Sequence, residues 1–278
     1  MGASCLDRQS SVPDGAASSK PREEPGRQES ARAAGFRTRM TARPTDKDRA
    51  VPLPTHFSFE TPDGPLAVGI DTLVVAGWTG RDKAAMEAHI AELEAIGVPR
   101  PATTPCFYRG ATSLLTQAPR IQVVGGETSG EVEFFVLQHN GAIWVGVGSD
   151  HTNRALETHS VSLSKQVCAK PIGRTLWPLA ALEDHWDALA LRSFATIDGV
   201  RMPYQGGPVT TMLPPADLIA GYRAAGGTFE DGTLMFCGTL AVQGGVRPAT
   251  RFEIEMHDPK AARTLSHAYD IEVLPDAG

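Results

Sequence analysis

Apolar residues along the chain fall mostly into short runs and alternating stretches, which are typical of β-strands. The segments between them are rich in Gly, Pro, Asn and Asp, the residues that favour turns. From about residue 55 onward this pattern predicts strands near 56–59, 66–68, 71–78, 131–137, 142–147, 160–168, 233–242 and 250–257.

Helical periodicity is less common. Residues 82–96 place apolar side chains on one helical face, and Gly97 is a stop signal, so a helix is predicted there. Further helices are predicted at about 183–192 and 215–225. The balance of elements predicts an α+β domain that is mainly β, with a few peripheral helices.

Residues 1–50 differ from the rest of the chain. They carry ten Lys and Arg and seven Asp and Glu, and they show no apolar periodicity. This composition predicts a disordered tail, and the seven acidic residues argue against an organellar presequence. Met40 is an alternative start of the protein. Residues 51–278 are predicted to form a single domain.

Composition narrows the class of protein. Among 278 residues, 41% are hydrophobic and 28 are Gly and 21 Pro, which suits a loop-rich, strand-heavy domain. The net charge of −6 gives no reason to expect nucleic acid or an acidic membrane as partner. The four cysteines are far apart, so neither a zinc ribbon nor a disulfide framework is predicted. No apolar signal-peptide core is visible, and the expected compartment is the cytoplasm.

Acidic residues gather on one predicted hairpin. Asn140-Gly141 between apolar runs is the strongest short signal for a two-residue turn, because both positions need a positive φ. This register puts Glu131 opposite Asp150, and alternation along the strand places Glu133 on the same face. Carboxylates this close repel unless a cation lies between them. An all-carboxylate group favours a hard ion such as Mg²⁺, Mn²⁺ or Ca²⁺, and the alternative is a solvated acidic face.

Other polar residues have structural interpretations. His151 follows Asp150, but on a strand its side chain points the opposite way, so a structural role is predicted. The motif at residues 184–187 is assigned to the start of a helix, where Asp is a favoured cap. Cys168 and Cys237 lie in apolar segments and are predicted core residues.

Five segments, in order along the chain, resemble motifs of the fumarylacetoacetate hydrolase superfamily. They are His89-Ile90-Ala91-Glu92 (a His-x-x-Glu lid), Glu131-Val132-Glu133 (Glu-x-Glu), Gly148 to Glu157 (Asn-Asp-x-Ser-Ala-Arg-Asp-x-Gln), Ser164-Lys165-Gln166 (Lys-Ser-Phe) and Asp231 to Thr239 (Gly-Asp-x-Ile-x-x-Gly-Thr). There are departures: the stretch between Glu133 and Asp150 is short, Gln166 replaces Ser, and Leu240 replaces Pro. The chain is therefore similar to a divergent branch of this superfamily.

The resemblance implies a mixed β-roll or sandwich of the fumarylacetoacetate hydrolase C-terminal-domain type, usually in a homodimer. It implies that Glu131, Glu133 and Asp150 hold Mg²⁺ or Mn²⁺, with Ca²⁺ as an alternative. The expected substrate is a small anionic 2-oxo acid. The implied reaction is hydrolysis of a C–C bond in an acylpyruvate-like diketo acid, through an enolate that the cation stabilises.

The same resemblance assigns roles to further residues. Lys165 and Arg154 would anchor the substrate and add positive charge, with Lys170 competing for the role of active-site lysine. His89, oriented by Glu92, would be the general base. Gly238 and Thr239 would contact the substrate, and Glu157 would help to position water. The alternatives are a decarboxylase, hydratase, dehydratase or isomerase acting on a similar acid, and a non-catalytic binding protein with a structural cation.

Overall fold

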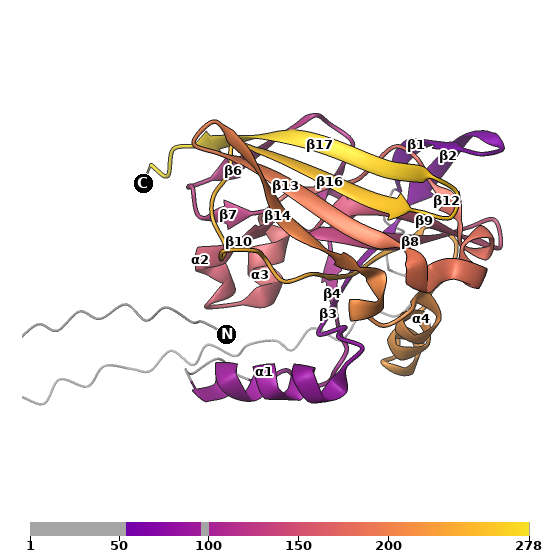
Figure 1. Ribbon diagram of the computed structural model, residues 1–278, viewed down its shortest axis with the longest axis horizontal. Helices are drawn as coiled ribbons and strands as arrows, with labels where there is room; N and C mark the ends of the chain where they lie inside the picture. Colours follow the sequence, from indigo (N-terminus) through magenta and orange to yellow (C-terminus); the bar gives the residue numbers. More distant parts are fainter. Residues whose placement is uncertain (1–53, 96–99, 278) are drawn as a thin grey trace, which may run out of the picture. The chain divides into compact units, whose positions relative to one another are not determined.

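Two large β-sheets packed face to face form the centre of the described chain, and further small sheets and helices surround them (Figure 1). A computed structural model of the protein describes residues 54–95 and 100–277. The predicted tail at residues 1–50 and Met40 lie outside the described residues. Among the helices that are described, none is long and apolar enough to cross a membrane.

The larger sheet has six strands and is buried on both faces. These strands are β3 (Thr72–Gly77), β4 (Cys106–Gly110), β8 (Val132–His139), β9 (Ala142–Ser149), β12 (Trp177–Pro178) and β15 (Thr233–Thr239). Their spatial order is β12-β9-β8-β15-β3-β4, with β15 parallel to β3. Burial on both faces explains why β8 and β15 contain the continuous apolar runs 134–137 and 234–237 rather than alternating patterns.

The second sheet has five strands and covers one face of the first. These strands are β6 (Arg120–Val124), β13 (Ala190–Ile197), β14 (Val200–Pro208), β16 (Arg251–Asp258) and β17 (Arg263–Leu274), in the order β14-β13-β16-β17-β6. Strand β16 alternates strictly between buried and partly exposed positions. Its inward side chains Phe252, Ile254 and Met256 belong to the core between the two sheets.

Small elements complete the fold. Three two-stranded sheets pair β1 (Thr55–Thr61) with β2 (Gly64–Ile70), β7 (Thr128–Ser129) with β10 (Thr152–Asn153), and β5 (Leu115–Thr116) with β11 (Lys170–Pro171). The helices are α1 (Lys83–Ala95), α2 (Arg154–Glu157), α3 (Val161–Gln166) and α4 (Pro215–Ala224), with short 3-10 helices η2 (Thr112–Leu114), η3 (Leu179–Ala181), η4 (Glu183–Ala188) and η5 (Val209–Thr211). Side chains of the β1–β2 hairpin pack on the second face of the six-stranded sheet, in a cluster with Phe135 and Phe236.

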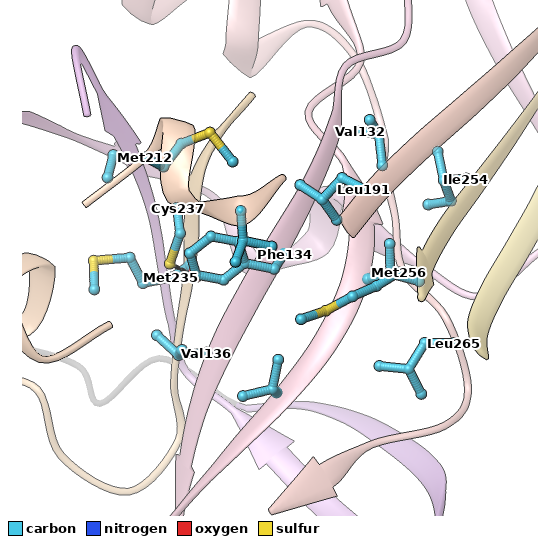
Figure 2. Packing of buried hydrophobic residues seen from close by; sticks show 14 of the residues in the cluster. Val132, Phe134, Val136, Leu191, Met212, Met235, Cys237, Ile254, Met256 and Leu265 are labelled. Atoms are coloured by element: carbon cyan, nitrogen blue, oxygen red, sulfur yellow. Dashed lines mark hydrogen bonds between the residues drawn. The ribbon is translucent and has the colours of Figure 1, made fainter. Parts of the chain in front are cut away.

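Phe134 lies at the centre of the core between the large sheets. Figure 2 shows its ring between Met235 and Cys237 of β15 on one side and Leu191 and Met256 of the other sheet. The side chain is fully buried. Its ring also meets the ring of Trp186 edge-on, with centroids 5.0 Å apart. The two sheets therefore depend on this residue for close packing.

The structure confirms several sequence predictions. The hairpin around Asn140-Gly141, the strand at 71–78, the helix at 215–225 and the buried positions of Cys168 and Cys237 are all present. Helix α1 begins after Asp82, whose carboxylate accepts hydrogen bonds from the backbone N–H groups of Ala84 and Ala85.

Two predictions of secondary structure were wrong. The segment 160–168 is not a strand but contains α3, because the Ser160 hydroxyl accepts from Leu163 N and caps a helix. The predicted helix at 183–192 ends early: η4 is interrupted at His185, which has non-helical φ and ψ, and β13 starts at Ala190. Strands β13 and β14 were missed, although the turn Asp198-Gly199, with φ of 51° and 77°, was a readable hairpin signal.

His185 is held between two carboxylates, so residues 184–187 contribute to the fold. The predicted Asp cap is absent, because the N-cap of η4 is Leu182 and no side chain caps this helix. Nδ1 of His185 contacts the Asp184 carboxylate, and its Nε2 lies 3.1 Å from Oδ1 of the buried Asp258. Asp258 also accepts a hydrogen bond from Nε of Arg263 at 3.0 Å. Hydrogen bonds to Asp184 and Asp258 raise the pKa of His185. These contacts join η4 to the β16–β17 turn.

We expect Phe134→Ala to lower the free energy of unfolding by about 3–5 kcal/mol, because it removes buried apolar surface and leaves a cavity between the sheets. Phe134→Leu should cost less, since it leaves a smaller cavity. Urea unfolding followed by circular dichroism measures both. A loss under about 1 kcal/mol for Phe134→Ala would contradict the central position of this ring.

His185→Asn should lower the melting temperature by an amount that depends on pH. A raised pKa means that the charged imidazole stabilises the folded state below the unfolded pKa of about 6.5, and this contribution is lost as the pH rises through the folded value. The difference between wild type and variant should therefore be larger at about pH 6 than at about pH 9. Thermal melts across this range test it, and a difference that grows with pH would be the opposite result.

Candidate metal centre

The β8–β9 hairpin fixes the position of two acidic residues. Asn140 and Gly141 have φ of 51° and 74°, so they form the two-residue turn that the sequence predicts. The carboxylate of Asp231 accepts hydrogen bonds from both of their backbone N–H groups, at 2.9 and 3.4 Å. At the open end of the hairpin, Asp150 N donates to Glu131 O at 3.0 Å. The predicted register is confirmed, and Glu131 faces Asp150.

Three carboxylates meet at this open end. One oxygen from each of Glu131, Glu133 and Asp150 lies within 4.8 Å of the other two. Glu133 is 2% exposed and Asp150 is 0% exposed, while Glu131 is partly exposed. The group is therefore not a solvated acidic face, which was the alternative left open by the sequence. Buried carboxylates at this separation need compensating positive charge.

Two lysines contact different oxygens of the Asp150 carboxylate. Lys165, on α3, contacts Oδ2 of Asp150 and lies 3.7 Å from Oε2 of Glu131. Lys170, on β11, lies 3.0 Å from Oδ1 of Asp150 and donates a hydrogen bond to His151 O at 2.6 Å. Burial raises the pKa of Asp150, but the two ammonium groups outweigh this effect and hold that pKa at about 2. Asp150 is therefore an ionised carboxylate in a buried site.

The two lysines differ in exposure. The Lys165 side chain is 13% exposed and reaches the carboxylates from a short surface helix, whereas Lys170 is 1% exposed. Burial lowers the pKa of Lys165, but the charges of Asp150, Glu131 and Glu133 raise it by more. Lys170 is thus enclosed behind Asp150, and Lys165 lies on the side nearer to solvent.

Glu133 has a different environment. It accepts a hydrogen bond from Gly238 N at 2.7 Å. Burial, together with the charges of Asp150 and Glu131, raises the pKa of Glu133 well above its usual range. A divalent cation between the three carboxylates would favour the ionised form of Glu133. The donor set consists of oxygens only, so these residues fit a hard cation.

Gly238 can make this contact because it lacks a side chain. Its φ is +101°, and a Cβ at this position would lie 1.9 Å from Oγ1 of Thr79. The next residue, Thr239, donates its hydroxyl to Val132 O and accepts from Nε2 of Gln205, both at 2.8 Å. The structure places both residues beside Glu133, and their predicted contact with a substrate stays a prediction.

Arg154 extends the cluster on the side of Glu131. It begins α2, and one of its terminal nitrogens lies 3.1 Å from Oε1 of Glu131 while the other lies 2.8 Å from Oε2 of Glu157. Its Nε donates to Oγ of Ser129 at 2.7 Å. The sequence resemblance thus brought together residues that are neighbours in space, although their roles toward a substrate stay predictions.

Two candidate residues cannot be placed in the site. His89 and Glu92 lie on α1, as predicted, but their side chains are outside the described part of the structure. Their predicted roles as general base and orienting acid stay predictions.

A buried polar network of Ser149, His151 and Tyr269 lies next to Asp150. His151 is 0% exposed, and its Nδ1 lies 3.0 Å from the hydroxyl of Tyr269, which also contacts Oγ of Ser149 at 2.9 Å. Burial, and then the charge of Lys170, lowers the pKa of His151 to about 3. This supports the structural role predicted for His151. Tyr269 and Gln205 were not identified from the sequence, because no local pattern indicates that their side chains reach the hairpin of the other sheet.

Comparisons with known proteins place the chain in a family. Residues 76–269 match the model of the family described as Protein of unknown function (DUF2848). No protein with curated information matches the sequence.

Solved structures with the same fold confirm the predicted fold class. A candidate fumarylacetoacetate isomerase/hydrolase from Oleispira antarctica is 19% identical, with a TM-score of 0.57, over 78% of this chain and 99% of that chain. A candidate fumarylpyruvate hydrolase from Burkholderia cenocepacia is 18% identical, with a TM-score of 0.53, over 84% and 100%. A 2-keto-3-deoxy-D-arabinonate dehydratase is 16% identical, with a TM-score of 0.52, over 74% of each chain. The chain therefore has the fumarylacetoacetate hydrolase fold at low sequence identity.

Lys165 and Lys170 should differ in how much each contributes to the free energy of unfolding. We expect Lys170→Met to lower the free energy of unfolding by about 3 kcal/mol or more, because it leaves buried charge on Asp150 uncompensated on one side. Lys165→Met should cost less, since Lys165 is closer to solvent. Urea unfolding in the presence of a chelator measures both variants. Equal losses, or a larger loss for Lys165→Met, would contradict the distinction.

Proposed function

The chain belongs to the DUF2848 family, and from its fold and its carboxylate cluster we propose that it is a divalent-cation-dependent hydrolase of acylpyruvate-like 2-oxo acids. The observation that carries this proposal is the meeting of Glu131, Glu133 and Asp150 within 4.8 Å, partly enclosed and flanked by cationic side chains. An oxygen-only donor set supports Mg²⁺ or Mn²⁺, with Ca²⁺ as an alternative.

The cation would act as a Lewis acid toward the carboxylate and 2-oxo oxygens of the substrate. The protein side chains have complementary tasks. Lys165 and Arg154 lie at the accessible side of the cluster and can pair with a substrate carboxylate. Lys170 is enclosed and keeps Asp150 ionised and oriented. This difference supports Lys165, rather than Lys170, as the lysine that meets the substrate.

Hydrolysis of an acylpyruvate breaks the bond between the acyl carbon and the methylene carbon of the pyruvate part. The hydroxyl of water adds to the acyl carbon, and the electron pair of the broken bond takes up a proton on the pyruvate part. The products are a carboxylic acid and pyruvate. We propose that His89 removes the proton from water and that Glu92 orients His89, one helical turn away on α1.

Dehydration of a 2-keto-3-deoxy sugar acid is a second candidate reaction. It is favoured by the similarity in fold to 2-keto-3-deoxy-D-arabinonate dehydratase. Loss of water needs no attacking water, so this reaction does not depend on His89 in the role proposed above. Lys165 would still be required beside the substrate.

We also propose that the protein is a homodimer, which light scattering after gel filtration can test.

The test is a panel of acylpyruvates and 2-keto-3-deoxy acids, offered to the purified full-length protein after chelation and after addition of Mn²⁺ or Mg²⁺. We expect cation-dependent release of pyruvate and one carboxylic acid in equal amounts. Lys165→Met should reduce kcat/KM by about 100-fold or more, by analogy with the loss of other groups that stabilise developing charge. Lys260→Met, which changes an exposed lysine on the β16–β17 turn, is the matched control.

Three outcomes would count against the hydrolase. Turnover that is unchanged after chelation would show that the reaction does not need the cation. Wild-type rates for Lys165→Met would show that the reaction does not need this lysine. If His89→Ala keeps full turnover while Lys165→Met abolishes it, the dehydratase is favoured over the hydrolase.

A further inference from the structure

We infer that Gln205, on the opposite sheet, is a positioning residue that fixes the backbone between Glu131 and Glu133 for cation binding. The inference rests on the proposed cation site. It begins from an irregularity in β14, where the pairing register with β13 shifts: Ser193 pairs with Gln205, but Phe194 pairs with Pro203. Tyr204 is therefore the extra residue of a β-bulge.

The bulge directs Gln205 into the protein. In a regular strand, neighbouring side chains point to opposite faces, yet Tyr204 and Gln205 are 0% and 2% exposed. Because a bulge breaks the alternation, it can re-aim a side chain, and bulges are common next to functional sites for this reason. Here the re-aimed side chain is an amide, which is costly to bury unless it is fully hydrogen-bonded.

All four hydrogen-bonding positions of the Gln205 amide are used. Oε1 accepts from Val132 N at 2.9 Å and from Oγ of Ser193 at 3.0 Å. Nε2 donates to Oγ1 of Thr239 at 2.8 Å and to Leu240 O at 2.7 Å. A buried amide satisfied on every side has a single orientation, so Gln205 is rigid.

The partners of this amide surround the candidate ligands. Val132 lies between Glu131 and Glu133 in the chain. Its N–H donates to Gln205 and its C=O accepts from the Thr239 hydroxyl, on the side of β8 that faces β15. The register between β15 and β8 is irregular there, between Phe236 and Thr239. Gln205 and Thr239 thus supply to Val132 the hydrogen bonds that a regular strand would supply.

The same contacts also fix the position of Gly238, which donates a hydrogen bond to Glu133. Gly238 N donates to the Glu133 carboxylate, and Gly238 precedes Thr239, which Gln205 also holds. One side chain from the other sheet therefore contacts both the backbone that carries the two glutamates and the end of β15 that orients one of them. Outer residues that orient metal ligands commonly change affinity by 10- to 100-fold when they are replaced.

The test is the affinity of the full-length protein for Mn²⁺, measured by isothermal titration in the absence of substrate. We expect Gln205→Leu to weaken binding by about 10- to 100-fold. Ser193→Ala is the matched control: it removes one hydrogen bond to the same amide but leaves the contacts to Val132 and Thr239, so its affinity should stay within about threefold of wild type. The Mn²⁺ electron paramagnetic resonance spectrum should change in Gln205→Leu and not in Ser193→Ala.

Gln205→Glu keeps the shape and the acceptors but loses the donors to Thr239 and Leu240, and we expect weaker binding than in wild type. It decides the question if Gln205→Leu does not fold. Wild-type affinity in a folded Gln205→Leu or in Gln205→Glu, or an equal loss in Ser193→Ala, would overturn the inference. If wild type itself binds no divalent cation, it is the proposed function that fails.

Discussion

Repulsion among three carboxylates at the end of one hairpin is the constraint that the surrounding structure has to meet. The turn at Asn140-Gly141 sets the register that brings Glu131 opposite Asp150, and this arrangement concentrates negative charge where little water can screen it. Lys165 and Lys170 engage Asp150, and Arg154 engages Glu131. The pKa of Glu133 is raised, so a bound cation would change the ionisation of this carboxyl group more than that of the other two.

The rest of the fold makes this concentration of charge tolerable. The six-stranded sheet is packed on both faces, so β8 and β15 are rigid where they end at the cluster. Among the candidate ligands, Glu133 is on β8, Glu131 directly precedes β8 and Asp150 directly follows β9. Lys165 and Arg154, by contrast, are on the short helices α3 and α2. Fixed carboxylates and more accessible cationic side chains suit the proposed site, which would hold an ion and also admit an anionic substrate.

Local signals were enough to predict the hairpin, its register and the facing carboxylates, because a two-residue turn determines every pair that follows it. The placement of Lys165 and Arg154 beside them followed from the motif resemblance. Non-local features were not accessible in this way. The segment with Lys165 was predicted as a strand, although the Ser160 cap makes it a helix. The role of Gln205 depends on a bulge in β14, and its partners lie up to 73 residues away in sequence. Local sequence patterns contain no information about such contacts.

We propose that Glu131, Glu133 and Asp150 hold one cation together. Anomalous diffraction from crystals of the full-length protein grown with Mn²⁺ is the test, because the signal locates the ion without reference to activity. The expected result is a strong anomalous peak that places the ion within bonding distance of one oxygen of each carboxylate. A peak beside other groups instead, or no peak at the three carboxylates while Mn²⁺ is in excess, would contradict the shared cation site.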